Sequence, residues 1–377
     1  MPVHQKWVFT TPGDIRAAPA IGLDGNVYIG IEKDGVNADN PDDADAMFCA
    51  LNGATGHKRW IYLARGEYPT VTPVAANGLA YFMTGDGNII ALDAKTGRKK
   101  WSFSTHGTAD ESEGTGICVS RDNAIYATTL NLGLFAIDGR TGHKKWNRPD
   151  LTRFPSDGPA IGPDGTIFFT ALRGKTFGSS YTNMLVQAIN PVTGKTIWAY
   201  DTGIRDGGDE GLSQPTVYNG KVYVYADKCI ALNAASGRLV WQHSVGQLAA
   251  KPAIGPSGSV LVLESTTNTR GPIITTISAF NGGTGATLWQ SRIVSPSSKD
   301  AYPEHDVVGP TYIPSGAILF VSGSSLVAVN SSRGMKVWST QIANLIGGCV
   351  SNYSGLILVR SVTSRNGSKN SSVFAMR

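Results

Sequence analysis

The stretch IALDAKTGRKKW, residues 90–101, decides the fold because the chain repeats it. Each copy reads Ala, an apolar residue, Asp or Asn, two variable residues, Thr or Ser, Gly, three variable residues and Trp. A fixed period of this length is typical of repeat proteins whose units pack against their neighbours. The complete copies, the last with Arg at the Thr or Ser position, are residues 49–60, 90–101, 135–146, 187–198, 230–241, 278–289 and 327–338.

One further copy is split between the chain ends. FAMR (374–377) carries the first half of the pattern, and Trp7, in HQKW (4–7), supplies the second half. We therefore predict an all-β protein: a single eight-bladed β-propeller domain over residues 1–377, with four-stranded antiparallel blades and the N-terminal strand completing the C-terminal blade. The tryptophans expected to dock the blades are residues 7, 60, 101, 146, 198, 241, 289 and 338.

Two hairpin signals recur in every repeat. Upstream segments such as PAIGLDGNVYIG (19–30) and PTVYNGKVYVYA (215–226) predict a strand, a two-residue turn and a second strand. In the Trp motif, Asp or Asn caps the second hairpin turn and Gly takes a positive φ. The Trp then opens the outermost strand and packs between adjacent blades.

Composition restricts the class of protein. Apolar residues make up 41% and charged residues 16%, which indicates a packed core, and the net charge of +5 is too mild to require nucleic acid. The chain has no apolar run of transmembrane length. The four cysteines are widely spaced, so we expect small buried residues rather than disulfides or a CxxC motif: Cys49, Cys118, Cys229 and Cys349.

The N-terminal sequence MPVHQKWVFT lacks an apolar signal core. We expect a cytoplasmic protein if Met1 is the native start, and a periplasmic or secreted one if a leader has been removed. We expect a monomer.

The repeat resembles the tryptophan-docking repeat of the pyrroloquinoline-quinone (PQQ) propeller superfamily over nearly the whole chain. The resemblance implies the eight-bladed fold. The superfamily contains quinoprotein alcohol dehydrogenases, and also non-catalytic members: the propeller lipoprotein of the bacterial outer-membrane assembly machine and sensor domains of some kinases. Function is therefore left open by the resemblance.

The dehydrogenase branch of the superfamily has recognisable parts. Its members typically carry two adjacent cysteines over the quinone, a Trp beneath it, and calcium beside a catalytic Asp. This chain has no adjacent cysteines, and docking accounts for all eight tryptophans. We therefore expect no PQQ and place quinone-dependent dehydrogenase last among the functions, while a bound calcium is left open.

Long connections gather on one face of the expected propeller. We label the strands of each blade A to D. The A–B and C–D turns are short, whereas the B–C connections and D-to-A linkers lie at the other end and are long. Such one-sided insertions usually mark a binding face. The B–C insertions are 34–46, 173–183, 264–276 and 362–372, and the linkers are 105–116, 148–158, 201–214 and 291–309.

These observations favour a non-catalytic ligand-binding or protein-binding scaffold that uses the long-loop face. Its candidate ligand-binding residues precede the inner strands or lie in the linkers: Arg16, Arg153, Asp209, Gln214, Lys251 and Tyr302. The alternative is an enzyme (a lyase, cyclase or hydrolase) at the mouth of the central channel. Its acid/base group would be His305 with a carboxylate from Glu113, Asp157, Glu210 or Asp306.

The residues before the docking Trp divide the repeats into two groups. They are basic in HQK (4–6), HKR (57–59), RKK (98–100) and HKK (143–145), but not in the later copies. Lys on an outer strand deters edge-to-edge aggregation. It could equally dock an acidic partner or an anionic surface, and the less charged edges could accept an added strand.

Overall fold

The computed structural model describes residues 4–32, 45–65, 68–69, 71–109, 116–130, 132–151, 158–172, 183–205, 213–225, 228–246, 251–266, 272–296, 307–313, 316–342, 345, 356–365 and 368–376. Within these residues the secondary structure is strands and one short 3-10 helix, Pro256–Gly258, which confirms the all-β prediction. The described chain contains no helix with the length and hydropathy of a membrane span.

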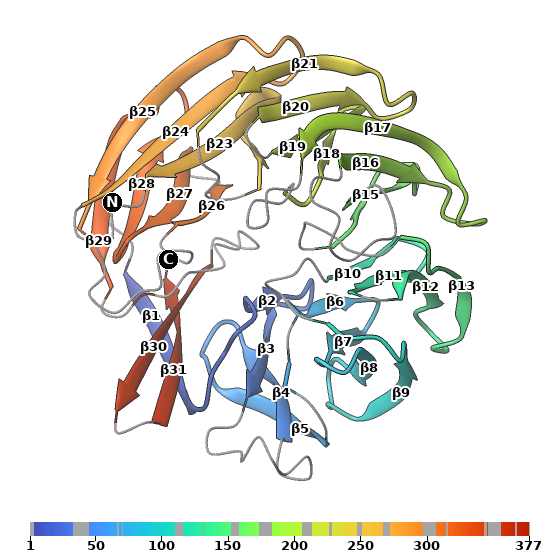
Figure 1. Ribbon diagram of the computed structural model, residues 1–377. Coiled ribbons are helices and arrows are strands. Elements are labelled where there is room, and N and C mark those ends of the chain that lie inside the picture. Colours follow the sequence, from blue (N-terminus) through green and yellow to red (C-terminus); the bar gives the residue numbers. More distant parts are fainter. Residues whose placement is uncertain are drawn as a thin grey trace. The chain divides into compact units, whose positions relative to one another are not determined.

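The chain divides into two compact units. The N-terminal unit comprises Thr10–Gln214 and Ser364–Ser371, and the C-terminal unit comprises Pro215–Thr363 together with Met1–Phe9 and Ser372–Arg377. Each unit contains four-stranded antiparallel sheets whose strands follow in chain order (Figure 1).

The sheets of the N-terminal unit are blades 1 to 4. Blade 1 consists of β2 (Ala20–Ile21), β3 (Asn26–Glu32), β4 (Asp45–Asn52) and β5 (Lys58–Arg65). Blade 2 consists of β6 (Val74–Ala76), β7 (Leu79–Met83), β8 (Asn88–Asp93) and β9 (Lys99–Ser104). Blade 3 consists of β10 (Ile117–Val119), β11 (Ala124–Thr129), β12 (Gly133–Asp138) and β13 (Lys144–Arg148), and blade 4 consists of β14 (Ala160–Ile161), β15 (Ile167–Leu172), β16 (Asn183–Ile189) and β17 (Thr196–Arg205).

The sheets of the C-terminal unit are blades 5 to 7. Blade 5 is β18 (Thr216–Tyr218), β19 (Lys221–Tyr225), β20 (Lys228–Asn233) and β21 (Leu239–Ser244); blade 6 is β22 (Ala253–Ile254), β23 (Ser259–Thr266), β24 (Ile273–Asn281) and β25 (Thr287–Ser295); blade 7 is β26 (Val307–Tyr312), β27 (Ala317–Ser322), β28 (Ser325–Asn330) and β29 (Lys336–Gln341).

The last sheet joins the two ends of the chain. Its order is β1 (Gln5–Pro12), β31 (Ser368–Met376) and β30 (Ile357–Arg365), so the N-terminal strand pairs with the C-terminal strand, as predicted. The first strand expected for this blade, around Cys349, lies outside the described residues. Together the sheets define the fold class as an eight-bladed β-propeller with a blade built from both termini.

The C–D turn takes the conformation that the motif predicts. In blade 2 the Asp93 carboxylate accepts hydrogen bonds from the backbone N–H groups of Lys95 (3.2 Å) and Thr96 (2.9 Å). Gly97 has φ +71° and donates its N–H to the Asp93 carbonyl at 2.8 Å. A left-handed φ of this kind is strained for residues with a Cβ, which explains the Gly of the motif.

The A–B turns follow the prediction only in part. Asn77–Gly78 and Asn219–Gly220 are two-residue turns with positive φ at both positions. Blade 1 instead has a longer turn, in which the Gly22 N–H bonds to the Asn26 carbonyl. There Asp24 accepts hydrogen bonds from Asn26 and Tyr28, so its side chain stabilises a wider loop than two residues allow.

In five of the described sheets the docking Trp is hydrogen-bonded to the next sheet of the same unit. Trp101 lies opposite the small Ala91 of its own motif, and its Nε1 donates to the Gly139 carbonyl of the next C–D turn at 3.0 Å. The Tyr81 hydroxyl donates to the same carbonyl at 3.1 Å. A Cβ on Gly142 would lie 2.8 Å from the Trp101 ring, so only Gly fits there. The same indole bond joins Trp60 to Ala94, Trp146 to Pro191, Trp241 to Gly282 and Trp289 to Ser331.

Several expected insertions are shorter than predicted because strands extend into them. In blade 6, β23 runs to Thr266 and β24 begins at Ile273, within the expected 264–276 loop. In the last blade, β30 runs to Arg365 and β31 begins at Ser368, so most of 362–372 is a hairpin. The expected linkers 201–214 and 291–309 likewise begin with strand residues of β17 and β25. β-Branched residues and Ser, common in these segments, favour pleated structure when they pair across strands.

Replacing Gly97 by Ala should lower the free energy of unfolding by about 3 kcal/mol, because a positive φ and a collision with the Trp60 ring add together. A Cβ there would lie 2.7 Å from that ring. Gly78→Ala is the matched control: its φ is +79° and a Cβ would meet nothing within 4 Å, so about 1 kcal/mol is expected. Urea unfolding measures both, and equal losses would contradict the docking role of Gly97.

Candidate functional site

The two ends of each described sheet differ in their connections. The A–B and C–D turns lie at one end, which we call the turn end, and the B–C connections and D-to-A linkers lie at the other, the loop end. The candidate residues from the sequence belong to the loop end. Eight of them lie outside the described residues, so their roles stay predictions: Glu113, Arg153, Asp157, Asp209, Glu210, Tyr302, His305 and Asp306.

Arg16 lies in a small polar cluster at the loop end of blade 1. Its Nε is 2.6 Å from a carboxylate oxygen of Glu32, at the end of β3. Its guanidinium lies 4.6 Å from the centre of the Tyr68 ring. The backbone of Asp14 pairs with that of Glu32 in both directions, at 2.9 and 2.8 Å. Arg16 is thus held by partners of its own chain, and this contact orders the approach to β2.

Gln214 and Lys251 occupy the segments that lead into first strands. The Gln214 side-chain amide donates to the Pro159 carbonyl at 3.3 Å, beside the start of β14. A Cβ on the neighbouring Gly158 would lie 2.8 Å from the Gly116 Cα, so these chain segments approach closely. Lys251 is exposed just before β22.

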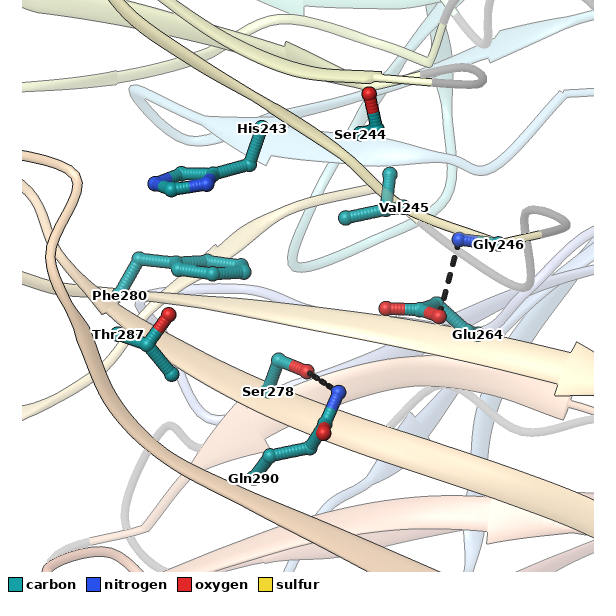
Figure 2. Close-up of a pocket in the computed structure, with 9 residues that line it drawn as sticks. All are labelled: His243, Ser244, Val245, Gly246, Glu264, Ser278, Phe280, Thr287 and Gln290. Carbon is teal, nitrogen blue, oxygen red and sulfur yellow. Dashed lines mark hydrogen bonds between the residues drawn. The ribbon is translucent and has the colours of Figure 1, made fainter.

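A groove of about 380 Å³ lies between blades 5 and 6 of the C-terminal unit (Figure 2). Sequence reasoning did not identify it. Edge strand β21 and the segment that follows it form one wall, and β23, β24 and β25 form the other. Its lining residues are His243, Ser244, Val245, Gly246, Glu264, Ser278, Phe280, Thr287 and Gln290.

Unequal strand lengths expose this groove. β24 and β25 have 9 residues each, whereas β20 and β21 have 6 each. The extra residues of blade 6 lie at its loop end, where Ile274 pairs with Val294 and Thr276 with Arg292. Val294, near the end of β25, is 58% exposed.

Hydrogen bonds fix the polar groups of the groove. Glu264 accepts the Gly246 N–H at 3.0 Å, and the Tyr225 hydroxyl donates to the Gly246 carbonyl at 3.0 Å, so Gly246 is held through both of its backbone polar groups. The second carboxylate oxygen of Glu264 points into the space between the two walls (Figure 2). On the same wall as Glu264, Gln290 donates to the Ser278 hydroxyl at 3.1 Å.

The opposite end of the groove is closed by two stacked rings. His243 stacks on Phe280 with centroids 4.9 Å apart and an interplanar angle of 12°, and its Nε2 contacts the Gly285 carbonyl. These contacts immobilise the imidazole in the packing between the blades. The groove therefore offers one carboxylate, a side-chain amide and hydroxyl groups: the chemistry of recognition by hydrogen bonds and charge.

Alternation along β23 was the signal for this site. Val260 and Val262 pack toward blade 5, and Glu264 is the next residue of the same face. Glu264 was expected to lie in the 264–276 insertion, where alternation has no meaning. Because Glu264 lies in β23, its carboxylate is directed at the neighbouring blade 5.

The described residues do not fit a quinone site of the dehydrogenase kind. Cys49, Cys118 and Cys229 lie in three different sheets. Burial raises the pKa of Cys49 and of Cys229 to about 12, so neither is a ready redox group. Within the described part of the chain, no three His, Cys, Asp or Glu side chains gather as metal ligands.

Comparison with known proteins assigns the family. The family described as "Outer membrane protein assembly factor BamB" matches residues 42–153 and 150–375. These segments cover most of the chain, which therefore belongs to this family of PQQ-like propellers.

Curated relatives match only a short segment. The chain is 44% identical over 70 residues to the dehydrogenase subunit of a quinone alcohol dehydrogenase from Gluconacetobacter polyoxogenes, which is 16% of this chain and 10% of that protein. It is 47% identical over 66 residues to the corresponding subunit from Gluconobacter oxydans, 15% and 9% of the two chains. The chain thus spans about a tenth of these relatives' length.

Solved structures share the fold across the whole chain. BamB from Moraxella catarrhalis superposes with a TM-score of 0.68 at 16% identity and covers 100% of both chains. Quinohemoprotein alcohol dehydrogenase from Comamonas testosteroni has a TM-score of 0.68 at 13% identity, covering 99% of this chain and 76% of the other. A europium-containing methanol dehydrogenase has a TM-score of 0.67 at 13% identity, with coverage of 99% and 93%.

Cys49 and Cys229 should resist alkylation by iodoacetamide in the native protein at pH 8, because burial leaves about one thiol in ten thousand ionised at a pKa near 12 and also blocks access. Peptide mass spectrometry measures the labelling of each cysteine separately. The same protein in urea is the control, and both residues should be labelled there. Rapid native labelling of either residue would contradict the packed role assigned to it.

Proposed function

We propose that this protein is a non-catalytic scaffold that binds an extended segment of a partner protein at the loop end of its sheets. The groove beside β25 is the described part of this surface. The main support for this proposal is that the strands of blade 6 extend beyond β21. Hydrogen-bonding groups and an apolar side chain on the blade 6 wall of the groove are therefore exposed.

The chemistry of the groove suits a peptide in strand conformation. β25 is the edge strand of its sheet, so the backbone groups along its outer side are not used by the sheet itself. Leu288 and Val294 are 52% and 58% exposed, and Gln290 is exposed between them on the same face. A strand laid along this edge would gain backbone hydrogen bonds and alternate contacts with side chains.

Glu264 gives the groove a charge preference. One carboxylate oxygen holds Gly246, while the other faces the groove (Figure 2). A Lys or Arg side chain of the partner would complete its hydrogen bonding. The scaffold role also agrees with the family, whose description names an assembly factor. The dehydrogenase relatives share only a short part of their length with this chain.

Selection from a random peptide library displayed on phage tests this proposal. Enriched peptides should carry Lys or Arg among β-branched residues. Gln290→Ala combined with Val294→Asp should weaken the selected peptides by at least about tenfold, because these side chains line the proposed contact. Fluorescence anisotropy with labelled peptides gives the dissociation constants.

Two variants make the test specific. Glu264→Gln keeps an acceptor for the Gly246 N–H but removes the charge, so it should abolish the preference for basic peptides. Val337→Asp is the matched control, since Val337 is 54% exposed on edge strand β29; it should bind as the wild type does. Peptides that bind all variants equally, or a selection without enrichment, would refute the groove as the binding site.

A further inference from the structure

The turn end of blades 1 to 3 is strongly basic. In these turns and the first residues of β5, β9 and β13, ten basic side chains stand against four acidic ones, Asp24, Asp93, Asp122 and Asp138. That excess exceeds the net charge of +5 for the whole chain. We call this set the basic platform: Lys58, Arg59, Lys95, Arg98, Lys99, Lys100, Arg121, Arg140, Lys144 and Lys145.

The acidic residues of these turns are engaged in holding the turns together. Asp93 and Asp138 each accept backbone N–H groups of their own turns, and Asp24 binds Asn26 and Tyr28. The basic side chains, in contrast, are all exposed. One of them, Lys100, also lies 3.2 Å from Asp93. The electrostatic potential at the turn end of blades 1 to 3 is therefore positive.

Hydrogen bonds between neighbouring blades hold the turns of the platform in place. The Asn77 amide of blade 2 donates to the Asn123 side chain of blade 3 at 2.9 Å. The Arg148 guanidinium of blade 3 donates to the Gly194 carbonyl of blade 4 at 2.6 Å. With the Trp bonds between the same sheets, the turns present their charges in a fixed array, which lowers the entropy lost on binding.

Apolar side chains project from the same end of the N-terminal unit. Val192, in the C–D turn of blade 4, is 81% exposed, and Leu23, in the A–B turn of blade 1, is 72% exposed. Among the described large apolar side chains these two are the most exposed. The Tyr rings of β3, β7 and β11 are buried between sheets, so they offer no stacking surface for bases.

We propose that the turn end of blades 1 to 4 docks on an anionic membrane surface. Lys and Arg side chains of the basic platform would contact lipid phosphates, and Leu23 and Val192 would enter the interfacial layer. Basic charge combined with exposed apolar tips favours a lipid surface over single-stranded nucleic acid, which would favour aromatic rings beside the charges. This inference uses the turn end and is independent of the function proposed for the loop end.

Co-sedimentation with lipid vesicles tests the proposal. The wild-type protein should bind vesicles of phosphatidylcholine mixed with phosphatidylglycerol and not vesicles of phosphatidylcholine alone, and added salt should weaken binding. The variant Lys58→Glu, Lys99→Glu, Lys144→Glu changes the same strand position in three blades. Its partitioning should fall at least about a hundredfold, since each basic residue removed costs about fivefold.

Matched variants separate local docking from general charge. Arg238→Glu, Arg333→Glu, Lys336→Glu makes the same charge change at exposed sites on the turn end of the C-terminal unit and should retain binding. Leu23→Ser with Val192→Ser should weaken binding by about tenfold, including at high salt. Thermal unfolding must show that every variant remains folded.

Three results would overturn the proposal. The first is binding that does not depend on phosphatidylglycerol. The second is an equal loss in both charge-reversal variants. The third is a DNA or RNA duplex that binds the protein more tightly than vesicles and displaces it from them, which would assign the platform to nucleic acid.

Discussion

The fold depends on the contact between the Trp of one sheet and the C–D turn of the next. In blade 2, the Trp101 indole and the Tyr81 hydroxyl donate to the same Gly139 carbonyl, and the Trp ring covers Gly142. These bonds are made only if the turn occupies a fixed position. A longer turn would displace its carbonyl and put a Cβ where the ring lies. The described C–D turns are therefore uniform in length, whereas the A–B turns and the connections at the other end of the strands vary.

This division explains where a binding surface can form. At the loop end a hairpin can lengthen without disturbing the docking contacts, and blade 6 does so: β24 and β25 exceed β21 by three residues each. The extension creates a wall with no equivalent in the shorter neighbour. The groove, the directed carboxylate of Glu264 and the exposed Val294 all follow from this difference in length. A propeller of this kind can acquire a site by extending strands while its core stays unchanged.

Local patterns made the fold predictable, whereas the site depends on distant contacts. The Trp spacing, the Gly of the C–D turn and the split repeat are all visible within about fifty residues of sequence. The segment 264–276 was expected to be an insertion, whereas its residues Glu264–Thr266 and Ile273–Thr276 belong to β23 and β24. The partners of Arg16, which are Glu32 and Tyr68, come together only through folding. Likewise, the mild net charge conceals how strongly charge is segregated at one end of the sheets.

The same docking apparatus supports proteins with different chemistry, so the fold alone does not decide activity. The activity of each protein depends on the side chains that take no part in packing one blade on the next. In the described part of this chain, the indoles with assigned bonds and the buried thiols serve packing, while carboxylates, amides, hydroxyls, imidazoles, cations and a few apolar side chains are accessible. Such groups can recognise a partner through hydrogen bonds, charge and apolar contact. The C–D turns that carry the docking contacts keep one length, whereas strands lengthen toward the loop end, so a site can be added at the loop end without altering the docking of the blades.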